Sequence, residues 1–133
     1  MIIKLLTLAV LSFPFSPPAK AACERALRGI QVDSQFRMGT TWDSTYFNIT
    51  NDSLGAKSVI QVKYADCEDD ACKQKLELLE NAYWKHQLLK FSVDEYTCSH
   101  LWDYFIQSNG GGTADFLKIN QLNTVEVDTR YPF

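Results

Sequence analysis

The sequence lacks both an excess of positive charge and the composition of a disordered chain. Of its 133 residues, 13 are Lys or Arg and 16 are Asp or Glu, which gives a formal net charge of −3. This balance argues against a nucleic-acid binder, because such proteins hold phosphates with basic side chains. Hydrophobic residues make up 46% of the chain and charged residues 22%, which excludes a disordered protein. The length is also too small for two ordinary domains.

Familiar catalytic and cofactor motifs are absent as well. The chain has no Gly-x-Ser-x-Gly elbow, and the glycines at 110–112 lack the Lys and Ser/Thr of a phosphate-binding loop. No two cysteines have the spacing of a zinc knuckle or a redox motif. No pair of carboxylates stands out as an acid–base couple. We therefore predict a non-enzymatic protein with no catalytic residue, metal site or cofactor.

The longest apolar run lies at the N-terminus, where residues 1–21 are typical of a secretory signal peptide. A lysine precedes the apolar run Leu5–Phe15, and Ala19-Lys20-Ala21 is a small-x-small cleavage pattern. The run is too short to span a bilayer, and no later run is long enough. We predict cleavage near Ala21 and export to the periplasm or the medium. An uncleaved anchor or a lipid-modified Cys23 are the alternatives.

The mature chain would be a single domain over residues 22–133. Removing residues 1–21 removes two lysines and no acid, so 112 residues with 11 bases and 16 acids remain, a net charge of −5. An even number of cysteines in a small exported chain predicts two disulfides. All four cysteines lie in the mature part: Cys23, Cys67, Cys72 and Cys98.

The residue pattern predicts an α+β domain in which a helical hairpin packs on a small, mostly antiparallel sheet. Residues 57–64 alternate as a strand does, and 69–90 place apolar residues on one helical stripe. Ser92 and Glu95 have the spacing of a capping box that would begin a second helix. The expected elements are, in order, a short helix at 23–31, a hairpin of strands at 42–51 and 57–64, helices at 69–90 and 93–108, and strands at 116–120 and 124–130.

Helix geometry favours one of the three possible disulfide pairings. With a turn near Ser92, Cys98 lies about 9 Å along the second helix and Cys72 about 30 Å along the first. Antiparallel packing then separates these two sulfurs by about 20 Å, whereas a bridge needs Cα atoms within about 7 Å. We therefore expect the pairs Cys67–Cys72 and Cys23–Cys98.

An acidic segment lies between and beside two of these cysteines, and its acids are Asp66, Glu68, Asp69 and Asp70. A loop closed by a disulfide is preorganised, which lowers the entropy cost of binding a partner, here one with a basic surface. The alternatives are capping of the following helix, whose N–H groups and dipole favour acids, and a calcium site, although the calcium-loop spacing is absent.

The Cys-x4-Cys loop at 67–72 is similar to the protruding loop of periplasmic vertebrate-lysozyme inhibitors. The resemblance covers those six positions alone. This loop carries acids where that family's loop carries a basic residue or a histidine, and the flanking helix differs, so we do not assign the chain to the family.

Aromatic residues gather on the expected helices. Trp84 lies off the apolar stripe of the first helix. On the second, Trp102 and Phe105 can share a face, while Tyr104 points elsewhere. Such a helix is either central to the core or partly exposed at an interface, where Trp and Tyr serve as anchors. We take Trp84, Trp102 and Tyr104 as candidate partner-binding residues.

Three functions are compatible with these features. We favour an exported protein that binds another protein, as an inhibitor or an immunity protein does, through its acidic loop. The first alternative is a small ligand-binding or envelope-maintenance module that uses the aromatic helix. The lesser alternative is a small secreted hydrolase or toxin, in which a free Cys98 thiolate would act with His86 as its base.

Overall fold

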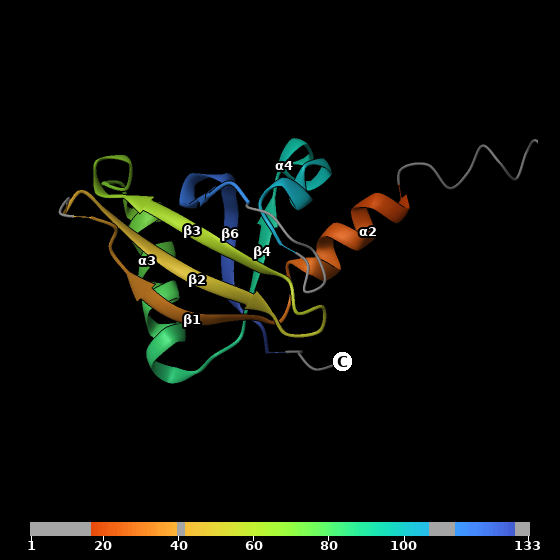
Figure 1. Ribbon diagram of the computed structural model, residues 1–133, viewed down its shortest axis with the longest axis horizontal. Helices are drawn as coiled ribbons and strands as arrows, with labels where there is room; N and C mark the ends of the chain where they lie inside the picture. Colours follow the sequence, from red (N-terminus) through yellow and green to blue (C-terminus); the bar gives the residue numbers. More distant parts are fainter. Residues whose placement is uncertain (1–16, 40–41, 107–113, 130–133) are drawn as a thin grey trace, which may run out of the picture.

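The computed structural model describes residues 17–39, 42–106 and 114–129, which form an α+β fold with a mixed six-stranded sheet (Figure 1). The helices are α2 (Pro17–Ala26), α3 (Asp70–Lys85) and α4 (Glu95–Ser99). The strands are β1 (Ile30–Phe36), β2 (Ser44–Asn51), β3 (Lys57–Lys63), β4 (Leu89–Val93), β5 (Leu117–Lys118) and β6 (Leu122–Val127). Short 3₁₀ turns are η1 (Tyr64–Asp66), η2 (Leu101–Asp103) and η3 (Ile119–Gln121). The predicted α+β class is thus confirmed.

The strands follow the order β5-β3-β2-β1-β4-β6. β1, β2 and β3 form an antiparallel meander, β5 pairs parallel to β3, and β4 pairs antiparallel to β6. β1 and β4 are joined at a single position, Ile30 opposite Leu89. The β4–β6 half therefore diverges from the meander, and Figure 1 shows these two strands crossing behind β1–β3 at a steep angle.

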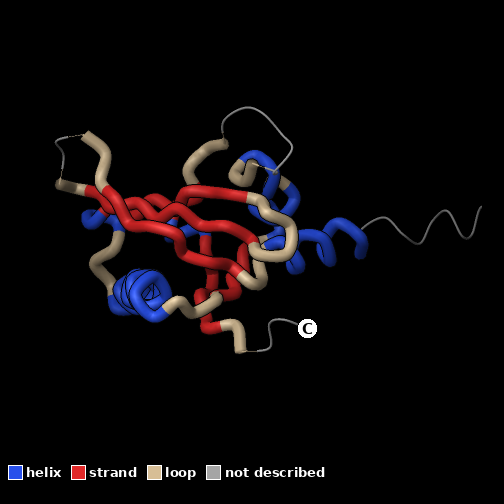
Figure 2. Tube along the Cα trace, turned by 60° about the horizontal axis from the view of Figure 1, so that its bottom comes forward, coloured by secondary structure: helices blue, strands red, loops and turns tan. Residues whose placement is uncertain are grey.

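The core lies between one face of the sheet and α3, which packs against β1 and β6. Figure 2 shows α3 beneath the sheet. The predicted stripe on this helix is confirmed, because Cys72 and Leu79 are buried and Leu76 and Tyr83 pack against the core. The predicted β2–β3 hairpin is confirmed too, and its strands bury alternate residues as a sheet with one covered face requires.

The predicted helical hairpin is wrong. Leu89–Val93 is not part of a helix but is strand β4, in which Leu89 and Phe91 are buried with period two. The first helix ends at Lys85, and His86 takes a left-handed φ of 55°.

The predicted capping box at Ser92 is also wrong. The helix begins after Asp94, whose carboxylate accepts a hydrogen bond from the backbone N–H of Thr97 at 2.8 Å. The hydroxyl of Ser92 instead bonds the hydroxyl of Thr124 across the β4–β6 ladder. Only Glu95–Ser99 of the expected second helix is α-helical among the described residues, and the last two residues of that expected helix, 107 and 108, lie outside them.

The largest omission of the sequence interpretation is strand β1. The expected short helix at 23–31 ends at Ala26 in the structure, and Ile30–Phe36 forms a strand between β2 and β4. The sheet therefore has six strands rather than four. The two predicted C-terminal strands are present in shorter form, as β5 and β6.

Both predicted disulfides form, although the long helical hairpin from which they were predicted does not. Cys23 pairs with Cys98, joining α2 to α4, and Cys67 pairs with Cys72 across the start of α3. Two disulfides are typical of a protein exported to an oxidising compartment.

Two side chains from distant parts of the chain bind the link between α2 and β1. Asn51, which is fully buried at the end of β2, donates hydrogen bonds to the carbonyls of Ala26 and Arg28 at 2.7 and 2.9 Å. Asp128, after β6, accepts from the Arg28 guanidinium at 2.8 Å and from the Gly29 N–H at 3.0 Å. Gly29 itself has a φ of 59°, which favours glycine at this junction.

Of the predicted signal segment, residues 1–16 lie outside the described part of the chain, and 17–21 form the first turns of α2. Lys20, Ala21 and Ala22 are exposed, and burial begins at Cys23. No helix among the described residues is both long and apolar enough to cross a bilayer.

Candidate functional site

The acidic segment follows β3 directly and is closed by its own disulfide. η1 ends at Asp66, and Cys67 and Cys72 are bridged with Cα atoms 5.1 Å apart. All four predicted acids are exposed, and together they form what we call the acidic loop: Asp66, Glu68, Asp69 and Asp70.

Side-chain capping bonds do not account for this concentration of charge, although Asp69 and Asp70 lie at the N-terminus of α3, where the helix dipole favours acids. Asp69 is the N-cap residue of α3, but its side chain makes no capping hydrogen bond. Within the described ranges, no ion pair joins any of the four carboxylates to a basic residue. The backbone is nevertheless anchored, since the Asp66 carbonyl accepts a hydrogen bond from Asn120 Nδ2 at 3.2 Å. The loop therefore presents free carboxylates on a fixed backbone.

A second exposed feature, the turn between β1 and β2, lies at the same end of the sheet. Met38 is 45% exposed and Trp42 is 74% exposed, and the Arg37 guanidinium lies 4.2 Å from the centre of the Trp42 ring. We call Arg37, Met38 and Trp42 the β1–β2 tip. The N–H of Tyr64, the first residue of η1, donates to the Asp43 carbonyl at 2.8 Å. This bond holds the tip beside the segment that leads into the acidic loop.

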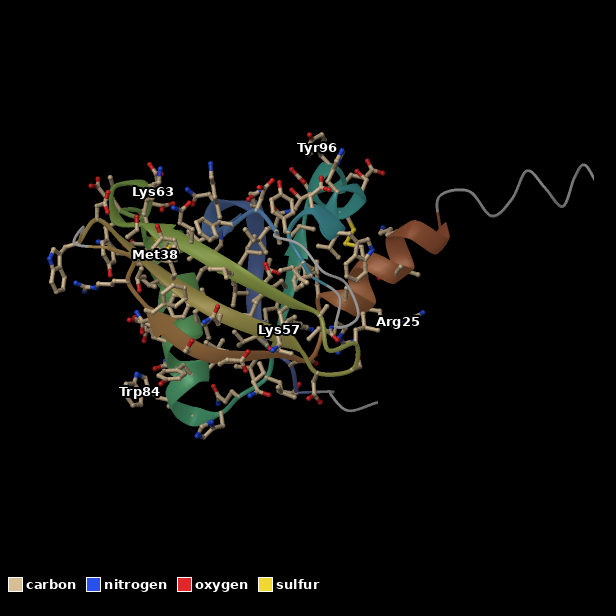
Figure 3. All side chains as sticks on the ribbon, viewed as in Figure 1. Arg25, Met38, Lys57, Lys63, Trp84 and Tyr96 are labelled. Carbon is tan, nitrogen blue, oxygen red and sulfur yellow. A yellow bond between two sulfur atoms is a disulfide. The ribbon has the colours of Figure 1, made fainter. Side chains whose placement is uncertain are left out.

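Figure 3 shows this proximity, because the labelled Met38 lies near Lys63 at the end of β3. The sequence interpretation missed the tip, since it placed Trp42 at the start of a strand. The strand begins at Ser44, and Trp42 precedes it without a pairing partner in the meander. The polar run that flanks Trp42 was the available signal, but exposure itself has no sequence signature.

Trp84 is not part of this surface. It is 74% exposed near the last turn of α3, about 20 Å along the helix from the acidic loop at its start. Figure 3 shows it well away from Met38 and Lys63. Its ring makes an edge contact with Tyr83, with centroids 5.1 Å apart.

Trp102 and Tyr104 lie in and after η2. Trp102 is 45% exposed and meets the buried Phe105 edge to face at 6.5 Å. Tyr104 is half-buried, and its hydroxyl accepts a hydrogen bond from Gln121 Nε2 at 3.0 Å. Gln121 follows Asn120, which bonds the acidic loop, so Tyr104 is linked to that loop through η3 and Trp102 is not.

The expected aromatic helix does not form. Its residues are divided between the short α4, the turn η2 and the segment that follows. The ligand-binding hypothesis that depended on such a helix therefore loses its structural basis.

The predicted nucleophile pair does not form either. Cys98 is oxidised in the disulfide with Cys23, and no described cysteine is free. His86 lies after α3, and His100 Nδ1 lies 2.9 Å from the Tyr96 carbonyl. No group of three or more His, Cys, Asp or Glu side chains in the described ranges is placed to hold a metal ion.

Two hollows accompany these features. One, of about 960 Å³, lies between α2, β4 and α4 beside the Cys23–Cys98 bridge. The other, of about 650 Å³, lies over β1, β2 and β3 on the face away from α3. Neither includes Trp102 or Phe105 in its lining.

No protein-family model, curated protein or solved structure matches this chain. A functional proposal therefore depends on the geometry of the chain itself.

Proposed function

We propose that this protein is exported to the periplasm or the medium, after cleavage near Ala21, and binds another protein without catalysing a reaction. The binding surface is the β1–β2 tip together with the acidic loop. Its mode of action would be that of an inhibitor or an immunity protein, which occupies a partner's surface. Trp84, at the far end of α3, and Trp102, in η2, lie outside this surface and are not part of the proposed contact.

The observation that carries the proposal is the pairing of an exposed tryptophan with a disulfide-closed acidic loop at one end of the sheet. Trp, Met and Arg are enriched in protein interfaces, and a few large anchors supply most of the binding energy. Trp42, Met38 and Arg37 provide all three types on one turn.

The acidic loop adds charge and rigidity to that anchor. Its disulfide removes conformations that binding would otherwise have to freeze, which lowers the entropy cost. Its four carboxylates favour a basic partner surface and accelerate association at low salt. The net charge of −5 for residues 22–133 acts in the same direction.

The test uses the exported protein, purified with both disulfides formed. It serves as bait to isolate a stoichiometric partner from the periplasm or the medium, whichever contains the protein. Trp42→Ala should weaken that complex about 30-fold, as expected for loss of an interface anchor worth about 2 kcal/mol. Glu68→Lys with Asp70→Lys should mainly slow association and reduce its salt dependence.

Trp84→Ala is the matched control, because Trp84 is exposed to the same extent as Trp42 at the far end of α3. It should change the affinity less than twofold. Failure to recover any stoichiometric partner would contradict the proposal. Equal weakening by Trp42→Ala and Trp84→Ala would contradict the assignment of the surface.

A further inference from the structure

The face of the β1–β3 meander away from α3 holds a hollow of about 650 Å³, a volume in the range of small-molecule sites. Its floor is formed by side chains that alternate with the core residues of the three strands. One wall is Ile106, which pairs with Lys57 through backbone hydrogen bonds of 2.7 and 2.9 Å. Ala114 and Asp115 complete that wall. Figure 3 places the labelled Lys57 on this side of the molecule, near the end of the meander.

A β-bulge directs a carboxylate into this hollow. Val32 is opposite Ile49, but Ser34 is opposite Asn48, so Asp33 is an extra residue in β1. Such a bulge turns consecutive side chains to the same face and is common beside binding sites. Here the Asp33 carboxylate accepts a hydrogen bond from the Thr50 hydroxyl, and the Ser34 hydroxyl accepts one from Asn48 Nδ2 at 2.9 Å.

The polar groups around the hollow combine donors with acceptors. Gln31 and Asn48 contribute amides, Thr50 a hydroxyl, Asp33 and Asp115 carboxylates, and Lys57 an ammonium group. Amides and carboxylates can bind adjacent hydroxyl groups, which both donate and accept. The two carboxylates and one ammonium leave the hollow with a net charge of −1, which disfavours an anionic ligand.

An aromatic row continues the same face toward the β1–β2 tip. The Phe36 and Tyr46 rings stack at 5.5 Å, and Phe116 lies against Tyr46 at 5.2 Å. All three are half-buried, so part of each ring faces solvent. Gln61 Nε2 donates to the Tyr46 hydroxyl at 3.2 Å and fixes that ring. Aromatic faces give an apolar platform beside the polar hollow.

We propose that this open face is a saccharide-binding site. One sugar ring occupies the hollow, where its hydroxyls bond Asp33, Gln31 and Asn48 and its apolar side contacts Val59 and Ile106. A neighbouring ring lies over the aromatic row. This site is separate from the protein-binding surface at the end of the sheet.

The test is saturation-transfer NMR of the exported protein with a panel of glucose, galactose, mannose and N-acetylglucosamine, each as monosaccharide, disaccharide and hexasaccharide. At least one sugar should receive saturation from the protein. Asp33→Asn and Gln31→Ala should each weaken its binding about tenfold, the effect of losing a hydrogen bond to a charged or buried group. A hexasaccharide that binds more tightly than the monosaccharide identifies a polymer as the source, and equal affinities identify a free sugar.

Val59→Trp provides a second route, because it fills the hollow without removing a polar partner. It should abolish binding while the melting temperature shows that the fold persists. The matched control is Asn123→Ala, an exposed strand residue on β6 outside the hollow. No saturation with any sugar overturns the proposal, and so does binding that Asp33→Asn, Gln31→Ala and Asn123→Ala leave equally unchanged.

Discussion

The two ends of the sheet are held by different means. At one end the link between α2 and β1 is tied by buried polar groups, Asn51 and Asp128, and by the long Cys23–Cys98 bridge. At the other end the acidic loop is closed by a short bridge of its own and leaves its carboxylates in solvent. The anchored end unites distant segments, whereas the loop end shapes one local surface.

This difference predicts how stability is distributed. In the chain-entropy account, a disulfide stabilises more when it closes a longer loop in the unfolded state. The Cys23–Cys98 bridge spans 75 residues in sequence and the Cys67–Cys72 bridge spans 5. Loss of anchoring should therefore destabilise the whole domain, and loss of the short bridge should act mainly on the loop.

The largest effect is expected from Cys23→Ala with Cys98→Ala. Removing the long bridge should lower the free energy of unfolding by about 4 kcal/mol. Urea denaturation measures this loss, and the variant without the Cys67–Cys72 bridge is measured beside it, each with its remaining disulfide kept oxidised. A loss smaller than that caused by removing the short bridge would reverse the comparison.

The second largest effect is expected from Asn51→Ala, which should lower the free energy of unfolding by about 3 kcal/mol. The change leaves the buried carbonyl of Ala26 and the partly buried carbonyl of Arg28 without their amide donor. It also removes the acceptor of the Leu54 N–H at 2.6 Å. Urea denaturation against the exposed control Asn123→Ala checks it. Equal stability of the two variants would show that the link is held by other contacts.

Cys67→Ala with Cys72→Ala should lower the free energy of unfolding by about 2 kcal/mol. The loss is smaller than for the long bridge because the Cys67–Cys72 disulfide closes a short loop. Cys72 is buried at the start of α3, so part of the loss comes from packing. The sharper measurement is hydrogen exchange, which should accelerate in residues 66–72 and remain unchanged around Asn51. Uniform acceleration across the sheet would contradict a local role.

The smallest effect is expected at Asp94, the cap of α4. Its hydrogen bond from the Thr97 backbone N–H lowers the pKa of this carboxyl. A lowered pKa in the folded state stabilises the protein above the unfolded pKa, and that contribution is lost as the pH falls through the folded pKa. Asp94→Ala should therefore lower the melting temperature at neutral pH and remove a part of its decline in acid.

Asp94→Asn is the control for that prediction. Asparagine caps helices as well as aspartate does but carries no charge. This variant should keep the neutral melting temperature while losing the same acid-dependent part. An unchanged acid decline in both variants would show that other carboxyls dominate.

Elements whose pattern is local could be predicted from the sequence. The apolar stripe on α3 repeats with the helical period, and the alternation in β2 and β3 repeats with the strand period of two. The buried face of each element can therefore be predicted without knowledge of its tertiary contacts. The even cysteine count predicted two disulfides for the same kind of reason, since it depends on composition and compartment.

Elements whose structure depends on pairing with distant segments could not be predicted from the sequence. Leu89–Val93 has apolar residues that suit either a helix or a strand, and pairing with β6 selects the strand. β1 carries polar residues at the bulge and was missed, although β2 and β4 flank it. The same limit applies to the candidate sites, because the exposure of Trp42 and the direction of Asp33 follow from the tip and the bulge.

The sequence by itself determined the α+β class, the hairpin, the face that α3 buries, the acidity and the cysteine content. The tertiary structure decided that the acidic loop lies beside Trp42, that Trp84 lies elsewhere, and that the meander has an open hollow. The physical reason is that composition and periodicity are properties of neighbouring residues. A surface or a hollow arises where segments far apart in the chain meet, which only the packed fold specifies.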